Sequence, residues 1–230
     1  MSNAQPQPPL EIPSSRTYLA ADPANVTALP LPPELPAGVL RNPRVMRLID
    51  VDAVSHGLVQ DTPADRASNQ DVQTFLDTVQ ATAREMDPQS LVRCAASTAT
   101  AAFHLDVLMA SGNNQWSIRR GLGGADQVLL DEMNELIRSC LIATWPGQRH
   151  TVQHPNLVIL VGQDHIYAPA VRRLRLLGIP TWLIVPGRPV AASLYSCSCA
   201  VTFLGRGDPG PATGAQLRPC PVPSAFSPEQ

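Results

Sequence analysis

The stretch NLVILVGQDHIYAPAVRRLRLLGIP, residues 156–180, decides the fold class of this chain. It opens with Leu157–Val161, five consecutive branched apolar residues, which is the pattern of a strand buried on both faces of a parallel sheet. Ala168–Leu177 then has apolar residues at helical spacing, and Gly178 favours a helix end. Because Ile179–Val185 resumes as an apolar strand, the stretch predicts a βαβ unit.

Strand and helix patterns alternate through the rest of the chain as well. Strands are expected over 44–51, 91–95, 115–119 and 200–204, with the third at or near a sheet edge. Helices are expected over 69–86, 98–109, 125–143 and 189–196, and a loop over 54–68. This alternation predicts a three-layer α/β/α fold with a mostly parallel, doubly wound sheet.

Both ends of the chain differ in composition from the middle. Residues 1–42 and 206–230 are rich in proline among small and polar residues, which predicts a disordered arm and a disordered tail around one domain over 43–205. The PLPP segments of the arm leave open a protein partner that binds proline-rich sequences.

Charge, cysteine content and apolar runs narrow the classes of function. The net charge of −2 excludes a protein that binds nucleic acid by global attraction, so a polyanion would need a local basic patch or bound cations. The five scattered cysteines form no CxxC pair, which predicts reduced thiols and a cytoplasmic location. No run reaches the roughly 18 apolar residues of a membrane helix, so no membrane partner is expected. With no GxGxxG after the first strand and no GK[ST], no nucleotide cofactor is expected either.

Three aspartates fall at comparable places in the predicted fold. Asp50 ends the first core strand, Asp126 begins the helix that follows RGLGG, and Asp164 follows the central strand. If the strands are parallel neighbours, these carboxylates converge on one edge of the sheet, where a Mg²⁺ or Mn²⁺ ion would relieve their repulsion. Taken singly, each acid also suits a turn or a helix start, so their common placement is what indicates a site.

Three stretches together carry a resemblance to a known family: RLIDVDAV, RGLGGADQVLLDEM and the stretch from Leu157 to Gly205. The chain resembles the NYN domain family, a branch of the PIN-like metal-dependent ribonucleases. The first stretch looks like the family's opening strand, the second like its G-x-D helix start, and the third like its signature of strand, SGD-type turn and helix. The resemblance implies a PIN-like fold and Mg²⁺- or Mn²⁺-dependent hydrolysis of RNA phosphodiesters, with Asp50, Asp126 and Asp164 as metal-binding and catalytic acids.

Two departures from the family pattern keep alternatives open. Ala53 stands where the family often has Asn, and Ile166 where it often has a second acid, which puts a two-metal site in doubt. A catalytically impaired NYN domain that binds RNA or a protein partner is the first alternative. A Rossmann-like regulator that binds a small molecule is the second.

Further polar residues are expected around the three acids. Those that could supply an outer carboxylate or a phosphate contact are Asp52, His165, Arg119 and Arg120. The arginines of the central helix, Arg172, Arg173 and Arg175, are typical of the solvated side of an amphipathic helix.

Overall fold

The fold is built on one parallel sheet. The structure, a computed structural model, describes residues 19–21, 26–59, 66–110, 116–121, 123–143, 154–187 and 190–205. Every strand pair in this part of the chain is parallel. The strands are β1 (Leu19–Ala21), β2 (Val45–Asp50), β3 (Leu91–Ser97), β4 (Trp116–Arg119), β5 (Leu157–Val161), β6 (Thr181–Val185) and β7 (Ala200–Leu204).

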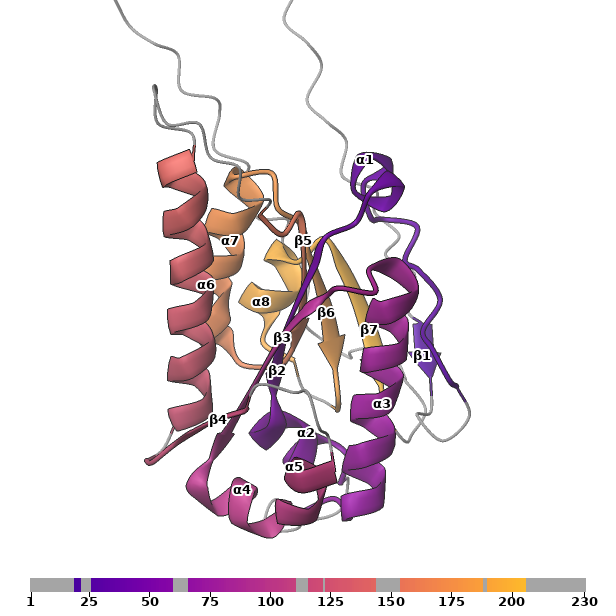
Figure 1. Cartoon of the computed structure of the whole chain (residues 1–230), viewed down its shortest axis with the longest axis vertical. Helices are drawn as coiled ribbons and strands as arrows, with labels where there is room; N and C mark the ends of the chain where they lie inside the picture. Colours follow the sequence, from indigo (N-terminus) through magenta and orange to yellow (C-terminus); the bar gives the residue numbers. More distant parts are fainter. Residues whose placement is uncertain are drawn as a thin grey trace, which may run out of the picture.

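Helices cover both faces of the sheet (Figure 1). They are α1 (Ala37–Arg41), α2 (Val51–Gly57), α3 (Asn69–Met86), α4 (Thr98–Phe103), α5 (Leu105–Ala110), α6 (Gly124–Ala143), the 3₁₀ turn η1 (His165–Tyr167), α7 (Ala168–Leu176) and α8 (Ala192–Cys197). One face carries α6, α7 and α8, and the other carries α3, so the predicted three-layer α/β/α fold is confirmed.

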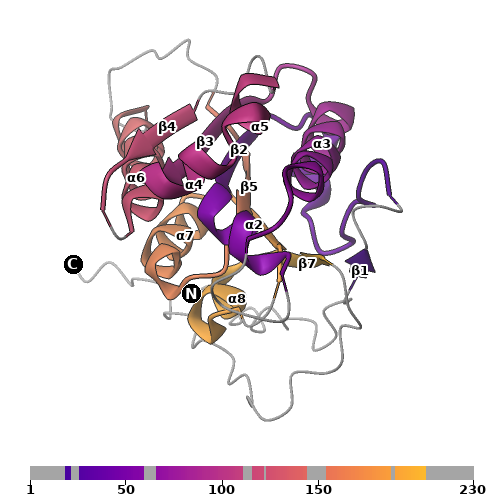
Figure 2. The same cartoon turned by 90° about the horizontal axis from the view of Figure 1, so that it is seen from below.

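The strand order creates a switch point in the middle of the sheet. The order is β1-β7-β6-β5-β2-β3-β4. Counted along the chain from β2, the six longer strands follow the doubly wound order 3-2-1-4-5-6, whose direction reverses between β2 and β5. The carboxyl ends of the strands point down in Figure 1, and Figure 2 looks on to this edge, where α2 lies near its centre. Ligands of open α/β sheets bind at such a point.

The central strands are apolar throughout because both of their faces are covered. All residues of β5, β6 and β7 are buried. Side chains alternate along β5, so Leu157, Ile159 and Val161 join the core under α3, whereas Val158 and Leu160 join the core under α6 and α7. On the α3 face, the one polar group of the buried Trp182 ring is satisfied, because its Nε1 donates to Thr202 Oγ1 at 2.9 Å.

Most predicted elements match the structure, and two elements in the first half of the domain differ from the prediction. The predicted loop over 54–68 is wrong at its start, because Asp50 caps a helix, α2, directly after β2. The predicted helix over 98–109 is two short helices that meet at His104. The bounds of α3 agree with the prediction, Ser68 caps this helix, and β4 is an edge strand as expected.

Part of the predicted disordered arm is ordered. β1 pairs with β7, and Leu29 and Leu35 are buried in the core under α3. Leu29 is held further by its backbone N–H, which donates to Thr82 Oγ1 at 2.8 Å. The proline-rich composition predicted disorder because it does not reveal such local contacts. Two buried leucines and a three-residue strand are enough to fix a segment against an existing core. The described part of the arm also holds helix α1, whereas residues 1–18 and 22–25 and the tail over 206–230 lie outside the described residues.

The described helices include none that is both long and apolar enough to cross a membrane.

Candidate functional site

Asp50 is the last residue of β2 and lies at the switch point. Its side chain is turned to the face that carries α6 and α7, and the residue is only 5% exposed. The Oδ1 atom accepts a hydrogen bond from the backbone N–H of Ala53 at 3.0 Å, which caps α2. The strand thus ends because its last side chain satisfies a free N–H of the helix that follows.

Asp126 approaches Asp50 from a different element. It lies in the first turn of α6, where an acidic side chain is favoured by the positive end of the helix dipole. The hydroxyl of Tyr167 lies 2.6 Å from Asp126 Oδ1 and 3.1 Å from Asp50 Oδ2. One phenol oxygen therefore joins two carboxyl groups that are distant in the sequence. We refer to Asp50, Asp126 and Tyr167 as the acid–phenol cluster.

When both carboxyl groups are ionised, the acid–phenol cluster has too few protons for the phenol to hydrogen-bond both carboxylates. A phenol has a single proton, so it donates to one carboxylate at a time. Burial, and then the charge of Asp50, raises the pKa of Tyr167, which keeps the phenol protonated. Burial also raises the pKa of Asp50 to about 7, and the neighbouring charges of Asp126 and Asp52 add to the shift. A protonated Asp50 completes the cluster, because it donates to the phenol while the phenol donates to Asp126.

Two glycines leave room for this arrangement. A Cβ at Gly162, directly after β5, would lie 3.2 Å from Cε2 of Tyr167 and 4.0 Å from Cβ of Asp50. The missing side chain at this position is what lets the tyrosine ring lie over the end of β5. Gly123 has a φ of +70° just before α6, and a Cβ there would lie 3.4 Å from Asp126 Oδ2. The turn after β4 thus brings Asp126 to the sheet edge.

Asp52 has a structural partner of its own. Its Oδ1 accepts from the backbone N–H of Ser97 at 3.0 Å and from Ser97 Oγ at 3.1 Å. Ser97 ends β3 and also caps α4 through the N–H of Thr100. Asp50 and Asp52 do not share one face of a strand, because the chain is helical from Val51 and Asp52 turns toward β3.

Asp164 lies just past β5 and is more exposed to solvent than Asp50. Its side chain is 48% exposed, and its Oδ1 accepts from the N–H of Ile166 at 3.3 Å. The same oxygen lies 2.6 Å from Nδ1 of His165, whose side chain is 81% exposed. Within the described residues, the contacts of Asp164 are thus confined to its own turn, and the structure does not join it to Asp50 and Asp126.

The arginines before α6 do not contact the acid–phenol cluster. Arg119 reaches Asp131 on the outer side of α6 at 3.4 Å, and Arg120 is exposed. A Cβ at Gly124 would lie 2.6 Å from the carbonyl oxygen of Arg119, so a glycine is required where β4 passes the start of α6. This contact places both arginines beside the helix that carries Asp126.

The residues offer oxygen ligands for a hard cation, and two of them converge. The paired carboxyl groups of Asp50 and Asp126 suit Mg²⁺ or Mn²⁺, which prefer oxygen ligands, and a cation would supply the positive charge that the buried Asp50 and the half-buried Asp126 lack. Across the described ranges, however, no set of three or more His, Cys, Asp or Glu side chains is gathered closely enough to hold a metal ion. The donor set therefore fits one ion held by two carboxylates, because the described contacts of Asp164 are to Ile166 and His165.

Tyr167 and Ser97 were not identified from the sequence. A general signal was available for the tyrosine, because a buried phenol needs a hydrogen-bond partner and Tyr167 closely follows an expected site residue. Nothing in the local pattern of Ser97 distinguishes a serine that binds a distant carboxylate from an ordinary helix cap.

Comparisons with protein-family models, with curated proteins and with solved structures gave no match for this chain.

Proposed function

We propose that the chain is a Mg²⁺- or Mn²⁺-dependent ribonuclease that hydrolyses RNA phosphodiester bonds at the carboxyl edge of its sheet. The observation that carries this proposal is the contact of one phenol oxygen with both Asp50 and Asp126. Two acids from distant segments thus converge at the switch point of a parallel sheet, where such folds bind their ligands. The resemblance to the NYN family supports the same reading.

The proposal assigns a separate task to each side chain. Asp50 and Asp126 hold the ion, and Asp164 turns away from His165 to become a third carboxylate at the same edge. When bound, the ion would lower the pKa of water and stabilise negative charge on the phosphate. Tyr167 positions the two carboxyl groups, and the exposed His165 is available to contact a phosphate oxygen of the substrate.

A cytoplasmic location belongs to the same proposal. It is supported by the cysteines in the described residues, none of which forms a disulfide there: Cys94, Cys140, Cys197 and Cys199.

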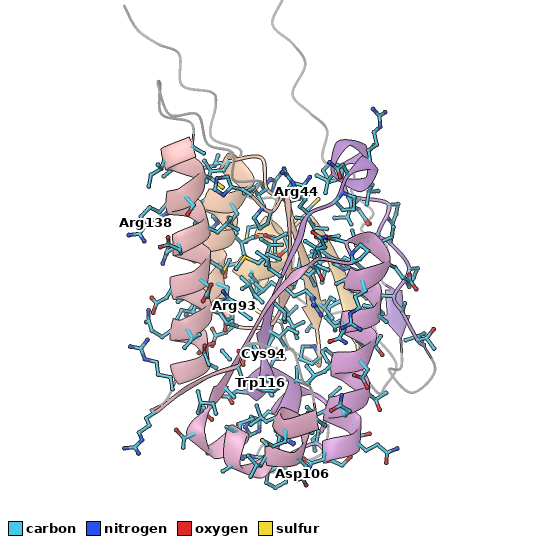
Figure 3. The ribbon with its side chains drawn as sticks, in the orientation of Figure 1. Arg44, Arg93, Cys94, Asp106, Trp116 and Arg138 are labelled. Atoms are coloured by element: carbon cyan, nitrogen blue, oxygen red, sulfur yellow. The ribbon has the colours of Figure 1, made fainter. Side chains whose placement is uncertain are left out.

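The test compares RNA cleavage by the full chain and by two aspartate variants. Single-stranded and structured RNAs are incubated with Mg²⁺, with Mn²⁺ and with EDTA. Asp126→Asn removes one charge from the acid–phenol cluster but keeps its shape, and Asp106→Asn, on the exposed surface of α5 (Figure 3), is the matched control. We expect cleavage that EDTA abolishes, that Asp126→Asn lowers at least tenfold, and that Asp106→Asn leaves unchanged. Cleavage that persists in EDTA or in Asp126→Asn would overturn the proposal.

A second candidate function is an RNA-binding domain without nuclease activity. The favouring observation is that the Tyr167 hydroxyl itself occupies the position between Asp50 and Asp126, while Asp164 contacts its own turn. This candidate predicts RNA binding that is equal with Mn²⁺ and with EDTA, and no cleavage under either condition.

A further inference from the structure

The exposed side of α7 is basic. The helix carries Arg172, Arg173 and Arg175 but no acidic residue, and all three arginines are exposed. None of them forms an ion pair within the described part of the chain. Pro169, Arg172, Arg173 and Leu176 are also spaced to lie on one side of a helix, so this exposed side is continuous. We call Arg172, Arg173 and Arg175 the α7 arginine face.

In the part of the chain that the structure describes, arginines on neighbouring elements, unlike those of α7, form ion pairs with carboxylates. The ion pairs between arginine and a carboxylate in the described residues all involve the opposite half of the sheet: Arg93–Glu132, Arg119–Asp131 and Arg138–Glu135. Each of these pairs has its acid on α6. Arg138 points outward from α6, away from the sheet (Figure 3).

No adjacent helix neutralises the α7 arginine face. α8 and α6 both pack against α7. The sequence of α8, ASLYSC, has no charged residue. The acids Asp131, Glu132 and Glu135 of α6 already pair with arginines outside α7. Like charges at helical neighbour positions, such as Arg172 and Arg175, destabilise a helix by a few tenths of a kcal/mol. A polyanion lying along α7 would offset this repulsion.

The α7 arginine face begins next to the acid–phenol cluster. Tyr167 is the N-cap of α7, so the helix starts at the residue that contacts both carboxyl groups. At about 1.5 Å per residue, Arg172 and Arg175 lie about 7 and 12 Å from Tyr167 along the helix axis. In a stacked strand with a phosphate about every 3.4 Å, this distance corresponds to roughly two to four phosphates.

We infer that the α7 arginine face binds the phosphate backbone of a single RNA strand that runs away from the acid–phenol cluster. The inference rests on the proposed function for the identity of the strand as RNA. The guanidinium group suits this task because it stays charged and can form paired hydrogen bonds to phosphate oxygens. The net charge of −2 makes such a local patch necessary for binding a polyanion.

The test measures RNA binding without allowing cleavage. A fluorescently labelled oligouridylate is titrated with the full chain in EDTA, over a series of salt concentrations. Arg172, Arg173 and Arg175 are replaced together by Gln, which removes three charges but keeps a long side chain and helix propensity. The control replaces three exposed arginines on other helices, Arg41, Arg84 and Arg138, by Gln, so the net charge changes equally. Thermal melts of all three proteins establish that each is folded.

We expect the α7 variant to bind at least tenfold more weakly at low salt, and the control to bind like the wild type. Each lost phosphate contact lowers the slope of log affinity against log salt by about 0.7, so the α7 variant should lose about 2 units of slope. Equal affinity and slope in the α7 variant and the wild type would overturn the inference, as would a wild type that does not bind the RNA.

The outcomes also separate this inference from the ribonuclease proposal. Loss of binding in the α7 variant, with no cleavage by the wild type in any metal, supports the inference and removes the nuclease. Metal-dependent cleavage by the wild type, with unchanged binding in the α7 variant, supports the nuclease and removes the inference.

Discussion

Replacing Asp50 by Asn should stabilise the protein, and increasingly so as the pH rises. Burial raises the pKa of this carboxyl group from 3.8 to about 7. The folded state therefore favours the protonated form, and the stability that this form provides is fully present below the ordinary pKa and is lost as the pH rises through about 7. The asparagine has no charge to bury. Its amide can still accept from Ala53 and donate to the phenol of Tyr167.

The magnitude follows from the shift in pKa. About 3 units at 1.36 kcal/mol each give a cost of about 4 kcal/mol for ionising Asp50 in the folded state. At pH 5 the unfolded chain has already released this proton, so about 1.7 kcal/mol of the cost is present, and about 2.5 kcal/mol more appears by pH 8. At about 2–4 °C per kcal/mol for a chain of this size, the difference in Tm between Asp50→Asn and wild type should widen by about 5–10 °C.

The assay is thermal unfolding followed by circular dichroism in EDTA at pH 5 and at pH 8, since a bound cation would mask the cost. The control is Asp106→Asn on α5, because an exposed carboxylate keeps its water on folding. A difference in Tm between Asp50→Asn and wild type that stays constant between the two pH values would refute the reasoning.

Three further predictions concern the surroundings of the two acids. Tyr167→Phe removes the only hydroxyl shared by both carboxyl groups in the described residues, and should lower the free energy of unfolding by about 1.5–3 kcal/mol in urea denaturation; an unchanged midpoint would mean that the phenol contacts add nothing. Gly162→Ala places a Cβ 3.2 Å from the tyrosine ring and should cost about 1–3 kcal/mol by the same assay, whereas Gly38→Ala meets nothing within 4 Å and should cost nothing; equal midpoints for the two variants would contradict this. Ser97→Ala removes a helix cap and a hydrogen bond to Asp52, and thermal unfolding should register a loss of about 0.5–2 kcal/mol; a wild-type Tm would show that neither bond stabilises the fold.

The layers of the fold could be predicted from the sequence because the central strands are apolar without interruption. Leu157–Val161 has no polar residue, which is typical of a strand covered on both faces by helices. The short helix α2 was missed because its seven residues are too few to display a helical period after an apolar strand. The sequence predicts Asp50 as the end of a strand, and the structure adds that Asp50 caps α2.

The candidate site was predictable only where it depends on topology. The approach of Asp50 to Asp126 follows from placing a strand end and a helix start at the same edge of a parallel sheet. The contacts of Tyr167 depend on how its ring packs beside Gly162, which no spacing in the sequence reveals. The separate orientation of Asp164 likewise depends on its hydrogen bond to Ile166 within one turn.

Direct measurement of metal binding tests the central claim that Asp50 and Asp126 form a site for a divalent cation. Mn²⁺ is titrated into the wild type, Asp126→Asn and Asp106→Asn, and free Mn²⁺ is followed by electron paramagnetic resonance at a pH above 7. The account predicts one Mn²⁺ per chain for the wild type and for Asp106→Asn, and at least about tenfold weaker binding for Asp126→Asn. A wild type that binds no Mn²⁺, or an Asp126→Asn variant that binds it as tightly as the wild type, would contradict the account.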